Sequence, residues 1–468
     1  MSLDILEKAI NYGRERGAEF IDIRYQEVLY ELIVIDNGVV RSYDTSIVKG
    51  LGVRVLVDKT IGYSATNRLD FESVKDSIDK AIKIARSARK YSALVEILKR
   101  RTFRDRIVSH YSIDPLEVDP SNKLEVLMDT YRSTKEVNGI VSSVVRYGFE
   151  RDYRVYVSSN GDFIEQTISL IGLSTFLVAR VENVMERLHD QKSSVAGWEF
   201  IKGMDYVKFG RENAELVVEA TKAPVVKPGK YTVVLDNEMV GLMLHEAFGH
   251  ATEADIVESG GSVLERRIGE KIASELVTVI DDGRVEGGYY LPYDDEGTPK
   301  TKTITVEKGV LKTYLHSLET AIRLGGEPTG NARVMYYEHP ILIRQTNTYM
   351  APGDWKPEEI IRDTREGIYV RGRGAMGGQV DTSMGTFTFT AGPSYLVKNG
   401  ELAQLVRGVM LSGNILDTLK NVDAVGRDLV VTTSVFGGCG KAYQRARVGD
   451  GGPHVRVREI ILGGGGYT

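Results

Sequence analysis

The sequence is poor in cysteine and lacks long apolar runs, and both absences narrow what the protein can be. One cysteine, Cys439, stands in 468 residues, so no intramolecular disulfide can form, which is typical of the reducing cytosol. No uninterrupted apolar run approaches the ~18–20 residues of a membrane span. The first 20 residues are amphipathic and charged on both sides, unlike a signal peptide. We therefore expect a cytoplasmic protein with no membrane partner.

The sequence also has no large excess of positively or negatively charged residues. The 60 Lys and Arg residues nearly balance 65 Asp and Glu residues, which leaves a net charge of −5 at pH 7. Without a bulk basic surface, a nucleic-acid partner is not expected. Hydrophobic residues make up 42% and charged residues 27% of the chain, as in ordinary globular proteins. The length suffices for two or three domains with cores of their own.

Residues 1–222 alternate between helical and strand periodicity, which predicts helices and antiparallel meanders. We expect helices over 3–17, from about Asp70 with Asp70 as the N-cap, from Ser121 and over 205–220. Strands are expected over 20–25, 30–35, 39–43, 51–57, 140–149, 153–159, 163–170 and 172–182. Asn37-Gly38 and Asn160-Gly161 occupy corresponding hairpin positions, since Asn-Gly favours type I′ turns. The recurring order suggests an internal duplication of residues 1–95 and 115–222.

A boundary is predicted at Lys222–Gly229, where two prolines and a glycine fall in eight residues. We therefore expect an N-terminal α+β domain over 1–222 and a C-terminal β-rich domain over 223–468. After a strand over 231–235, a helix should run from Asn237 to about Val257, with Asp236 as its N-cap. The expected fold class is α+β, with an N-terminal α/β region of helices and antiparallel meanders. The C-terminal domain should be mainly antiparallel β and carry this helix.

Two histidines and a glutamate occur within six residues, His245-Glu246-Ala247-Phe248-Gly249-His250, although the chain has only seven histidines. Neutral imidazoles suit Zn²⁺, and a glutamate beside such a pair is the usual general base of a zinc hydrolase. The motif predicts a metal-dependent hydrolase in which His245 and His250 bind the metal and Glu246 is catalytic. The alternative is a pair of buried core histidines beside a solvated glutamate.

The spacing of the two histidines differs from the familiar i, i+4 pattern. His250 follows His245 by five residues, which places it about 140° around a regular α-helix. Two imidazoles so placed could not share a metal ion. A single π-type turn would bring them together, and Gly249 would ease that distortion because glycine tolerates unusual backbone angles.

A catalytic zinc site usually needs a third protein ligand. The candidates are Cys439, many carboxylates and the remaining histidines, His110, His189, His316, His339 and His454. His316 and His339 lie in strand-like segments that favour a structural role. Cys439 stands among three glycines, which predicts a tight, exposed loop, and Lys441 would favour its thiolate. The alternative for Cys439 is a small buried hydrophobe.

Glu253 and Asp255 follow His245 by eight and ten residues. Either carboxylate could orient an imidazole from behind, as the partners of metal-bound histidines do. Both could equally belong to a solvated helix face.

Several motifs together resemble the TldD/PmbA metallopeptidase family. They are HEAFGHATEAD (245–255), GNAR (330–333), RQTNTYM (344–350), GGQVDTSMGTFTF (377–389), VRGVMLSGN (406–414) and GGCGK (437–441). Their order is the one expected, and they span most of the C-terminal half, whereas the N-terminal half fits more loosely. One departure is Ala442-Tyr443, where the family pattern continues with glycine.

The resemblance implies a TldD-like catalytic subunit that binds one Zn²⁺ through His245, His250 and Cys439. Glu246 matches the catalytic glutamate of the family, and Glu253, Asp255 and Lys441 are possible supporting residues. The implied substrates are unfolded or short peptides. The implied assembly is a homodimer or a heterodimer with a TldE/PmbA-like subunit that lacks the motif.

Three other interpretations stay open at this level. A non-catalytic partner or regulator, such as a gyrase modulator, predicts a degenerate metal motif. A zinc amidohydrolase acting on small molecules would share the chemistry but needs a closed pocket. A structural zinc site would normally have four protein ligands and no adjacent glutamate.

Overall fold

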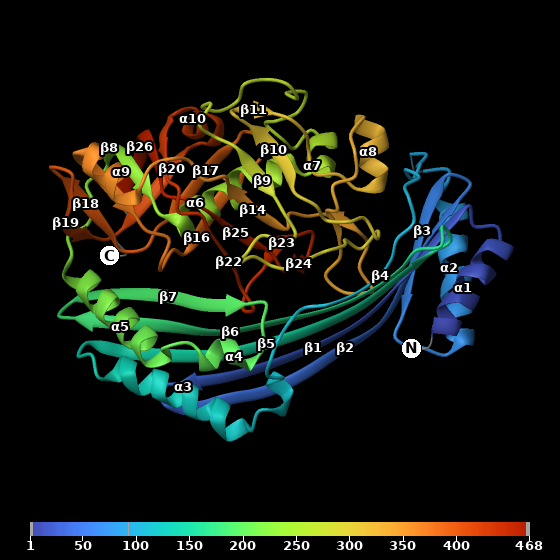
Figure 1. The fold of residues 1–468 in the computed structure, drawn as a ribbon, viewed down its shortest axis with the longest axis horizontal. Coiled ribbons are helices and arrows are strands. Elements are labelled where there is room, and N and C mark those ends of the chain that lie inside the picture. The colour runs from blue at the N-terminus through green and yellow to red at the C-terminus, as the bar shows by residue number, and fades with distance from the viewer. Residues whose placement is uncertain (1–2, 92, 465–468) are drawn as a thin grey trace.

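The computed structural model describes residues 3–91 and 93–464. Its N-terminal elements build one long, curved sheet with helices on its convex side, and the C-terminal elements sit against the concave side (Figure 1). The mixed α+β class is confirmed. Among the described residues, no helix combines the length and the apolar character needed to cross a membrane.

The N-terminal sheet has seven strands in the order β3-β2-β1-β5-β6-β4, and β7 also pairs with β6. Strands β1 and β5 pair antiparallel at its centre over fifteen residues, from Asp22↔Ser158 to Asp36↔Val144. The elements are α1 Leu3–Glu15, β1 Phe20–Asp36, β2 Val39–Val57, β3 Thr60–Thr66, α2 Phe71–Ala88, β4 Arg104–Val108, a 3₁₀ turn Pro115–Glu117, α3 Pro120–Lys135, β5 Ile140–Ser158, β6 Phe163–Val181, β7 Val184–Ser194, α4 Trp198–Lys202 and α5 Tyr206–Lys222.

The strands of this sheet are longer than the sequence pattern predicts. Each pair of short segments expected around residues 20–35, 39–57, 140–159 and 163–182 is one continuous strand. The segmentation was wrong because polar residues interrupt the apolar alternation, and these residues are paired in the fold. Gln26 donates to Asp152 across the strands at 3.0 Å, and Lys123 of α3 binds Glu31 at 2.7 Å. Strands β3 and β7 were not predicted.

Alternate residues of a strand point to opposite faces of the sheet, and the helices pack against the residues of one face. Ile21 and Ile23 of β1 pack under α1 and α2, and Ile33 and Ile35 pack under α3. Asp70 caps α2 by accepting from Ser73 N at 2.9 Å, as predicted. The helix expected from Ser121 begins instead at Pro120.

The C-terminal part contains two larger sheets. One is nine-stranded with the order β16-β17-β20-β26-β8-β15-β18-β19 plus β21, and the other is six-stranded with the order β11-β10-β9-β14-β25-β22. The strands are β8 Gly229–Leu235, β9 Val279–Asp281, β10 Thr303–Glu307, β11 Val310–Leu311, β12 Ala332–Arg333, β13 Leu342–Ile343, β14 Asn347–Met350, β15 Glu366–Val370, β16 Gly377–Asp381, β17 Thr386–Thr390, β18 Ser394–Lys398, β19 Glu401–Val406, β20 Val409–Asn414, β21 Val422–Val425, β22 Val430–Thr433, β23 Cys439–Lys441, β24 Gln444–Ala446, β25 Gly449–Gly452 and β26 Val455–Gly464.

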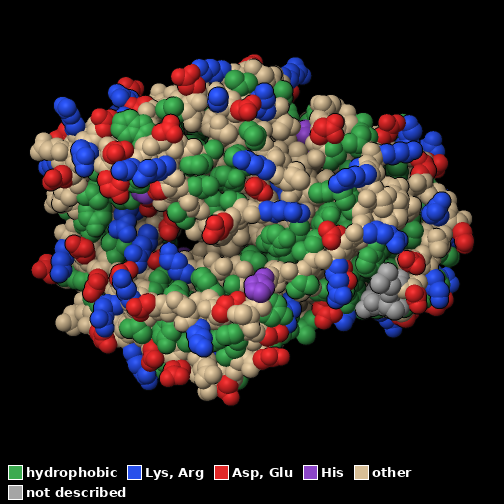
Figure 2. Space-filling view, in the orientation of Figure 1, with side chains coloured by type: hydrophobic (Ala, Val, Ile, Leu, Met, Phe, Trp, Pro, Cys, Tyr) green, Lys and Arg blue, Asp and Glu red, His purple; other side chains and the backbone are tan. Residues whose placement is uncertain are grey.

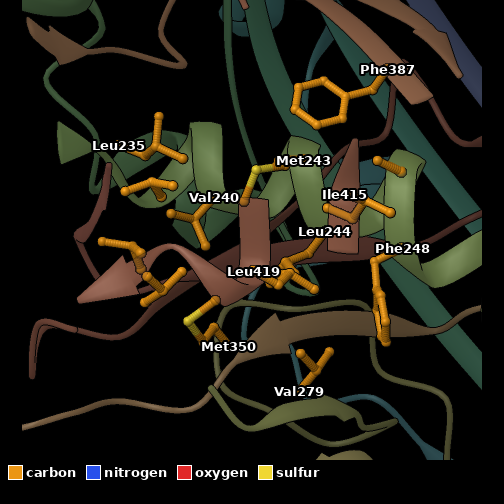
Figure 3. Close-up of a cluster of buried hydrophobic side chains, with 14 of the residues drawn as sticks. Leu235, Val240, Met243, Leu244, Phe248, Val279, Met350, Phe387, Ile415 and Leu419 are labelled. Atoms are coloured by element: carbon orange, nitrogen blue, oxygen red, sulfur yellow. The ribbon is translucent and has the colours of Figure 1, made fainter. Parts of the chain in front are cut away.

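The helix α6, Asn237–Met243, runs through the core of this part. Its side chains Val240 and Met243, with Leu244 just after it, point among residues of both sheets, including Met350 and Phe387 (Figure 3). Asp236 caps α6 by accepting from Met239 N at 2.9 Å, as predicted. The remaining helices are α7 Ala254–Glu258, α8 Leu318–Leu324, α9 Pro357–Thr364 and α10 Ile415–Lys420.

The single helix expected over 237–257 is not observed. Helical backbone ends at Thr252, and Glu253 has φ −70° and ψ 119°, an extended conformation, before α7 begins. The break places Glu253 under His250 instead of on a solvated face. The predicted boundary at 222–229 lies between the end of α5 and the start of β8, while the domain limits and the internal duplication stay predictions.

Candidate metal centre

The two motif histidines lie on a π turn. Residues Leu244–Gly249 form one turn of π-helix between α6 and a 3₁₀ turn over His250–Thr252. A π turn closes residue i onto i+5, so it places His250 beside His245, with 5.3 Å between the ring centroids. The predicted distortion is confirmed.

Gly249 permits the close packing of this turn. A Cβ atom at Gly249 would lie 1.8 Å from Oε1 of Gln345, whose side chain is fully buried. Gln345 in turn donates from Nε2 to the carbonyl of His245 at 3.0 Å and accepts from Thr348 Oγ1 at 2.6 Å. Strand β14 and its preceding loop therefore hold the π turn from behind.

Three metal-ligating side chains meet at this turn. One ligand atom each of His245, His250 and Cys439 lies within 4.8 Å of the others, and all three side chains are buried. The sulfur of Cys439 is 3.1 Å from Nε2 of His250. Cys439 is brought there by the β23–β24 hairpin, in which it pairs with Ala446.

The charges of the three groups are strongly coupled. Burial alone would raise the pKa of the Cys439 thiol, but His245 and His250 lower it to about 5. Burial would likewise lower the pKa of His245, but the charge and hydrogen bond of Cys439 raise it to about 9. The site therefore favours an anionic sulfur, the form that binds metal ions.

His250 is held by a chain of charged side chains. Its Nδ1 is 3.1 Å from Oε2 of the fully buried Glu253. Lys441 donates to Glu253 at 2.8 Å, to Asp255 at 2.7 Å and to the carbonyl of Ile343 at 3.0 Å. Burial alone would raise the pKa of Glu253, but His250 and Lys441 lower it to about 2. Glu253 thus stays ionised and fixes the ring of His250, leaving its Nε2 toward Cys439.

Glu246 faces a cavity of ≈ 290 Å³ together with His245, Cys439 and Asp450. Its carboxylate lies 3.9 Å from Nε2 of His250, and 39% of its side chain is exposed. The cavity lies between β7 on one side and C-terminal segments on the other, lined there by Gly372, Gly374, Ala375 and Thr432–Ser434. Figure 2 shows the surface hollowed between the C-terminal part and β7.

Two sequence expectations about the site residues are corrected. Cys439 is only 4% exposed and lies in a strand, so the predicted exposed loop is wrong. Lys441 does not act on the thiol but binds Glu253 and Asp255. Its hairpin turns the alternate side chains Cys439 and Lys441 inward, where Cys439 contacts His250 and Lys441 binds Glu253, the partner of His250.

The remaining histidines lie outside the cluster of His245, His250 and Cys439. His316 precedes α8 and His339 lies in a turn, so neither occupies the strand expected for it. His454 binds Asp428 at 2.6 Å, and His110 follows β4. His189 of β7, one of the candidate third ligands, lines the cavity together with Glu238, which the sequence pattern did not single out.

The residues present fit a catalytic zinc ion. Nδ1 of His245 is buried without a hydrogen-bond partner among the described residues, so none of them competes with a metal ion for that nitrogen. Two imidazoles and one thiolate form a donor set suited to Zn²⁺, and three protein ligands leave a position open, as in catalytic sites. The carboxylate of Glu246 lies beside these ligand atoms, 3.9 Å from Nε2 of His250.

Comparison with known proteins agrees with this geometry. Three family models match in order, namely PmbA/TldA metallopeptidase domain 1 over residues 21–85, the central domain over 113–221 and the C-terminal domain over 228–464. The chain belongs to the PmbA/TldD metallopeptidase family. It is also 37% identical over 450 residues to a metalloprotease of Methanothermobacter thermautotrophicus, with 96% of each chain covered.

Other relatives of the family carry more specific names. A zinc metalloprotease TldD homolog of Saccharolobus solfataricus is 29% identical and covers 98% of this chain and 99% of its own. A Thermotoga maritima crystal structure, described as a modulator of a DNA gyrase, superposes with TM-score 0.81 at 22% identity, covering 98% and 99%. TldE of Thermococcus kodakarensis has TM-score 0.78 at 19% identity, covering 98% and 100%. These two structures establish the shared fold.

Proposed function

We propose that this protein is a zinc-dependent peptidase that hydrolyses peptide bonds of unfolded or short peptides. One observation carries the proposal. The ligand atoms of His245, His250 and Cys439 converge within 4.8 Å at a cavity that also contains the carboxylate of Glu246. A non-catalytic regulatory subunit is expected to have a degenerate metal motif, whereas this set is complete. A structural zinc site normally has a fourth protein ligand and no adjacent glutamate.

Each residue has a defined task in this proposal. His245, His250 and Cys439 hold the metal ion, which when bound supplies a Lewis acid that activates water and polarises the peptide carbonyl. Glu246 takes the proton from the attacking water and then passes it to the leaving amine. Glu253 and Lys441 keep His250 in one orientation. Asp255 holds Lys441 in place.

An extended peptide fits the surroundings of the cavity. Strand β7 forms one border, β22 closes the six-stranded sheet, and β16 closes the nine-stranded sheet, so all three have an unpaired edge among the described residues. A peptide that adds to such an edge is bound through its main chain and thus with little sequence preference. A folded domain would not reach Glu246 through this opening.

The assembly is proposed from the similar fold of TldE. The proposed assembly is a homodimer or a heterodimer with a TldE/PmbA-like subunit. The activity assay should therefore be run on this chain alone and after addition of such a partner.

The deciding experiment compares wild type with Glu246→Gln. Both should bind one zinc ion, and the variant should lose about 10²–10⁴-fold of its turnover on an unstructured peptide. Glu286→Gln, at an exposed position outside the cavity lining, serves as the matched control and should retain activity. Substantial turnover by Glu246→Gln would remove the assigned role, and failure of wild type to bind zinc would remove the proposal itself.

A further inference from the structure

Glu238 lies in the first turn of α6 and lines the same cavity as His245 and Glu246. Among the described residues, no side chain or backbone group forms a hydrogen bond or ion pair with its carboxylate. The neighbouring Asp190 differs, because Arg373 binds it at 3.0 Å. Glu238 is thus a half-buried carboxylate without a partner, directed at the space where a substrate would lie.

The other charged groups around Glu238 do not neutralise it. Asp236 accepts hydrogen bonds from Met239 N and Gly372 N. Arg373 forms ion pairs with Asp190 and Glu212 and donates a hydrogen bond to Asn213. Lys192 of β7 also lines the cavity, but it forms no ion pair with Glu238. Burial lowers the pKa of His189, so this ring carries no charge at pH 7.

Nearer the metal ligands, the cavity contains two more carboxylates, Glu246 and Asp450. No described residue forms a hydrogen bond with the side chain of Asp450. A metal ion held by His245, His250 and the Cys439 thiolate would have one remaining positive charge, which faces these two carboxylates. The carboxylates of Glu238, Glu246 and Asp450, against one lysine and this charge, leave the lining acidic.

The pKa of Glu238 reflects the burial of its carboxylate without a partner. Burial, together with the like charges of Asp236 and Asp190, raises the pKa of Glu238 to about 7, although Lys192 and Arg373 attract the anion. Its position at the start of a helix favours a negative charge. That position explains why a carboxylate is tolerated there but supplies no partner for its oxygen atoms. A cation entering the cavity would supply one.

The distance to the metal ligands suits a peptide. Glu238 precedes His245 by seven residues, about 10 Å along the helix at 1.5 Å per residue. An extended peptide covers ~3.3–3.6 Å per residue. A group bound by Glu238 would thus lie about three residues from the bond that is cleaved.

We propose that Glu238 is a specificity-determining residue that binds a cationic group of the substrate, with Asp450 keeping the lining acidic between Glu238 and the metal ligands. The group is a protonated amine or a guanidinium. It is supplied either by the N-terminal ammonium of a short peptide or by a lysine or arginine side chain. This inference rests on the proposed peptidase function and names the substrate class of the same site.

Zinc-loaded wild type, Glu238→Gln and the control Glu286→Gln are compared on matched unstructured peptides. The peptides contain lysine, or norleucine in its place, each with a free or an acetylated N-terminus. Wild type and the control should prefer the cationic peptide by about tenfold in kcat/KM, as expected for a charge-assisted hydrogen bond. Glu238→Gln should lose this preference through KM while it cleaves the neutral peptide at the wild-type rate. The norleucine and acetyl arms identify the source of the cation.

A binding measurement separates this inference from the proposed function. Fluorescence anisotropy of the same peptides, labelled, is recorded with Glu246→Gln and with Glu246→Gln/Glu238→Gln. Loss of cation preference only in the double variant supports the acidic subsite, even if no peptide is cleaved and the peptidase proposal fails. The subsite is overturned if wild type binds and cleaves cationic and neutral peptides equally well. It is also overturned if Glu238→Gln still prefers the cationic peptides. The wild-type comparison decides this even if a Glu238 variant fails to fold.

Discussion

Lys441 binds three acceptors at once and is the residue on which the geometry of His250 depends. Its ammonium group contacts Glu253, Asp255 and the carbonyl of Ile343 within 3.0 Å. Without it, the fully buried Glu253 would keep only the imidazole of His250 and weak backbone support. Residues behind a metal ligand commonly change metal affinity because they fix its orientation.

Lys441→Met should therefore lower zinc affinity by about 10–100-fold, because it removes the ammonium and leaves the stem in place. Competition with a chromophoric chelator measures this loss. The control is Lys312→Met at a half-exposed position, where affinity should stay unchanged. An unchanged zinc affinity in Lys441→Met would show that Glu253 orients His250 without help from the lysine.

At the residue scale, the sequence was informative where chemistry alone singles a residue out. Two histidines and a glutamate in six positions, and a sole cysteine among glycines, are rare enough to be noticed. Glu238 and Asp450 were missed because nothing distinguishes them from the other Asp and Glu residues among 65. Their burial beside the metal ligands exists only in the folded chain.

At the element scale, the π turn is the feature that makes the motif usable. The five-residue spacing from His245 to His250 predicted it, because no regular helix brings residues five apart onto one face. The glycine at 249 is required by a contact from outside the helix, the side chain of Gln345. Sequence spacing thus indicated the distortion, whereas the reason for its packing lies in the loop that precedes β14.

Gly249→Ala should destabilise the protein by about 1–3 kcal/mol, as overpacking of a filled interior does. It should also weaken zinc binding, because Gln345 must move away from the carbonyl of His245. Denaturant unfolding and chelator competition measure the two effects. Gly440→Ala is the control, since its Cβ would meet no atom within 4 Å, and wild-type behaviour is expected there. If Gly249→Ala also behaves as wild type, the close contact with Gln345 does not constrain the turn.

At the scale of the whole molecule, the two halves are joined by buried ion pairs on the concave face of the N-terminal sheet. Arg154 of β5 binds Asp152 on its own strand at 2.7 Å and Asp295 of the C-terminal part at 2.8 Å. Arg54 of β2 binds Asp22 and Glu296 in the same way. These contacts fix the position of β7 relative to the C-terminal segments that form the other wall of the cavity.

Arg154→Met should cost about 3–5 kcal/mol, because it leaves Asp152 and Asp295 buried without their cation. We expect a lower urea midpoint for the first unfolding transition. Arg266→Met is the control at a 90% exposed side chain, where a change within about 0.5 kcal/mol is expected. Similar midpoints for the two variants would mean that the interface does not depend on this ion pair.

The sequence by itself determined the α+β class, the helix caps at Asp70 and Asp236, and three side chains that converge in the fold, His245, His250 and Cys439. The catalytic role of Glu246 stays a prediction. These features depend on local spacing and on the chemistry of single residues, and both can be read directly from the amino-acid sequence. Tertiary structure alone decided the length of β1, β2, β5 and β6, the extended backbone at Glu253 and the cavity beside β7. Each of these depends on partners that are distant in the sequence. A polar residue can be buried in the interior only when tertiary folding brings a polar or oppositely charged partner to it.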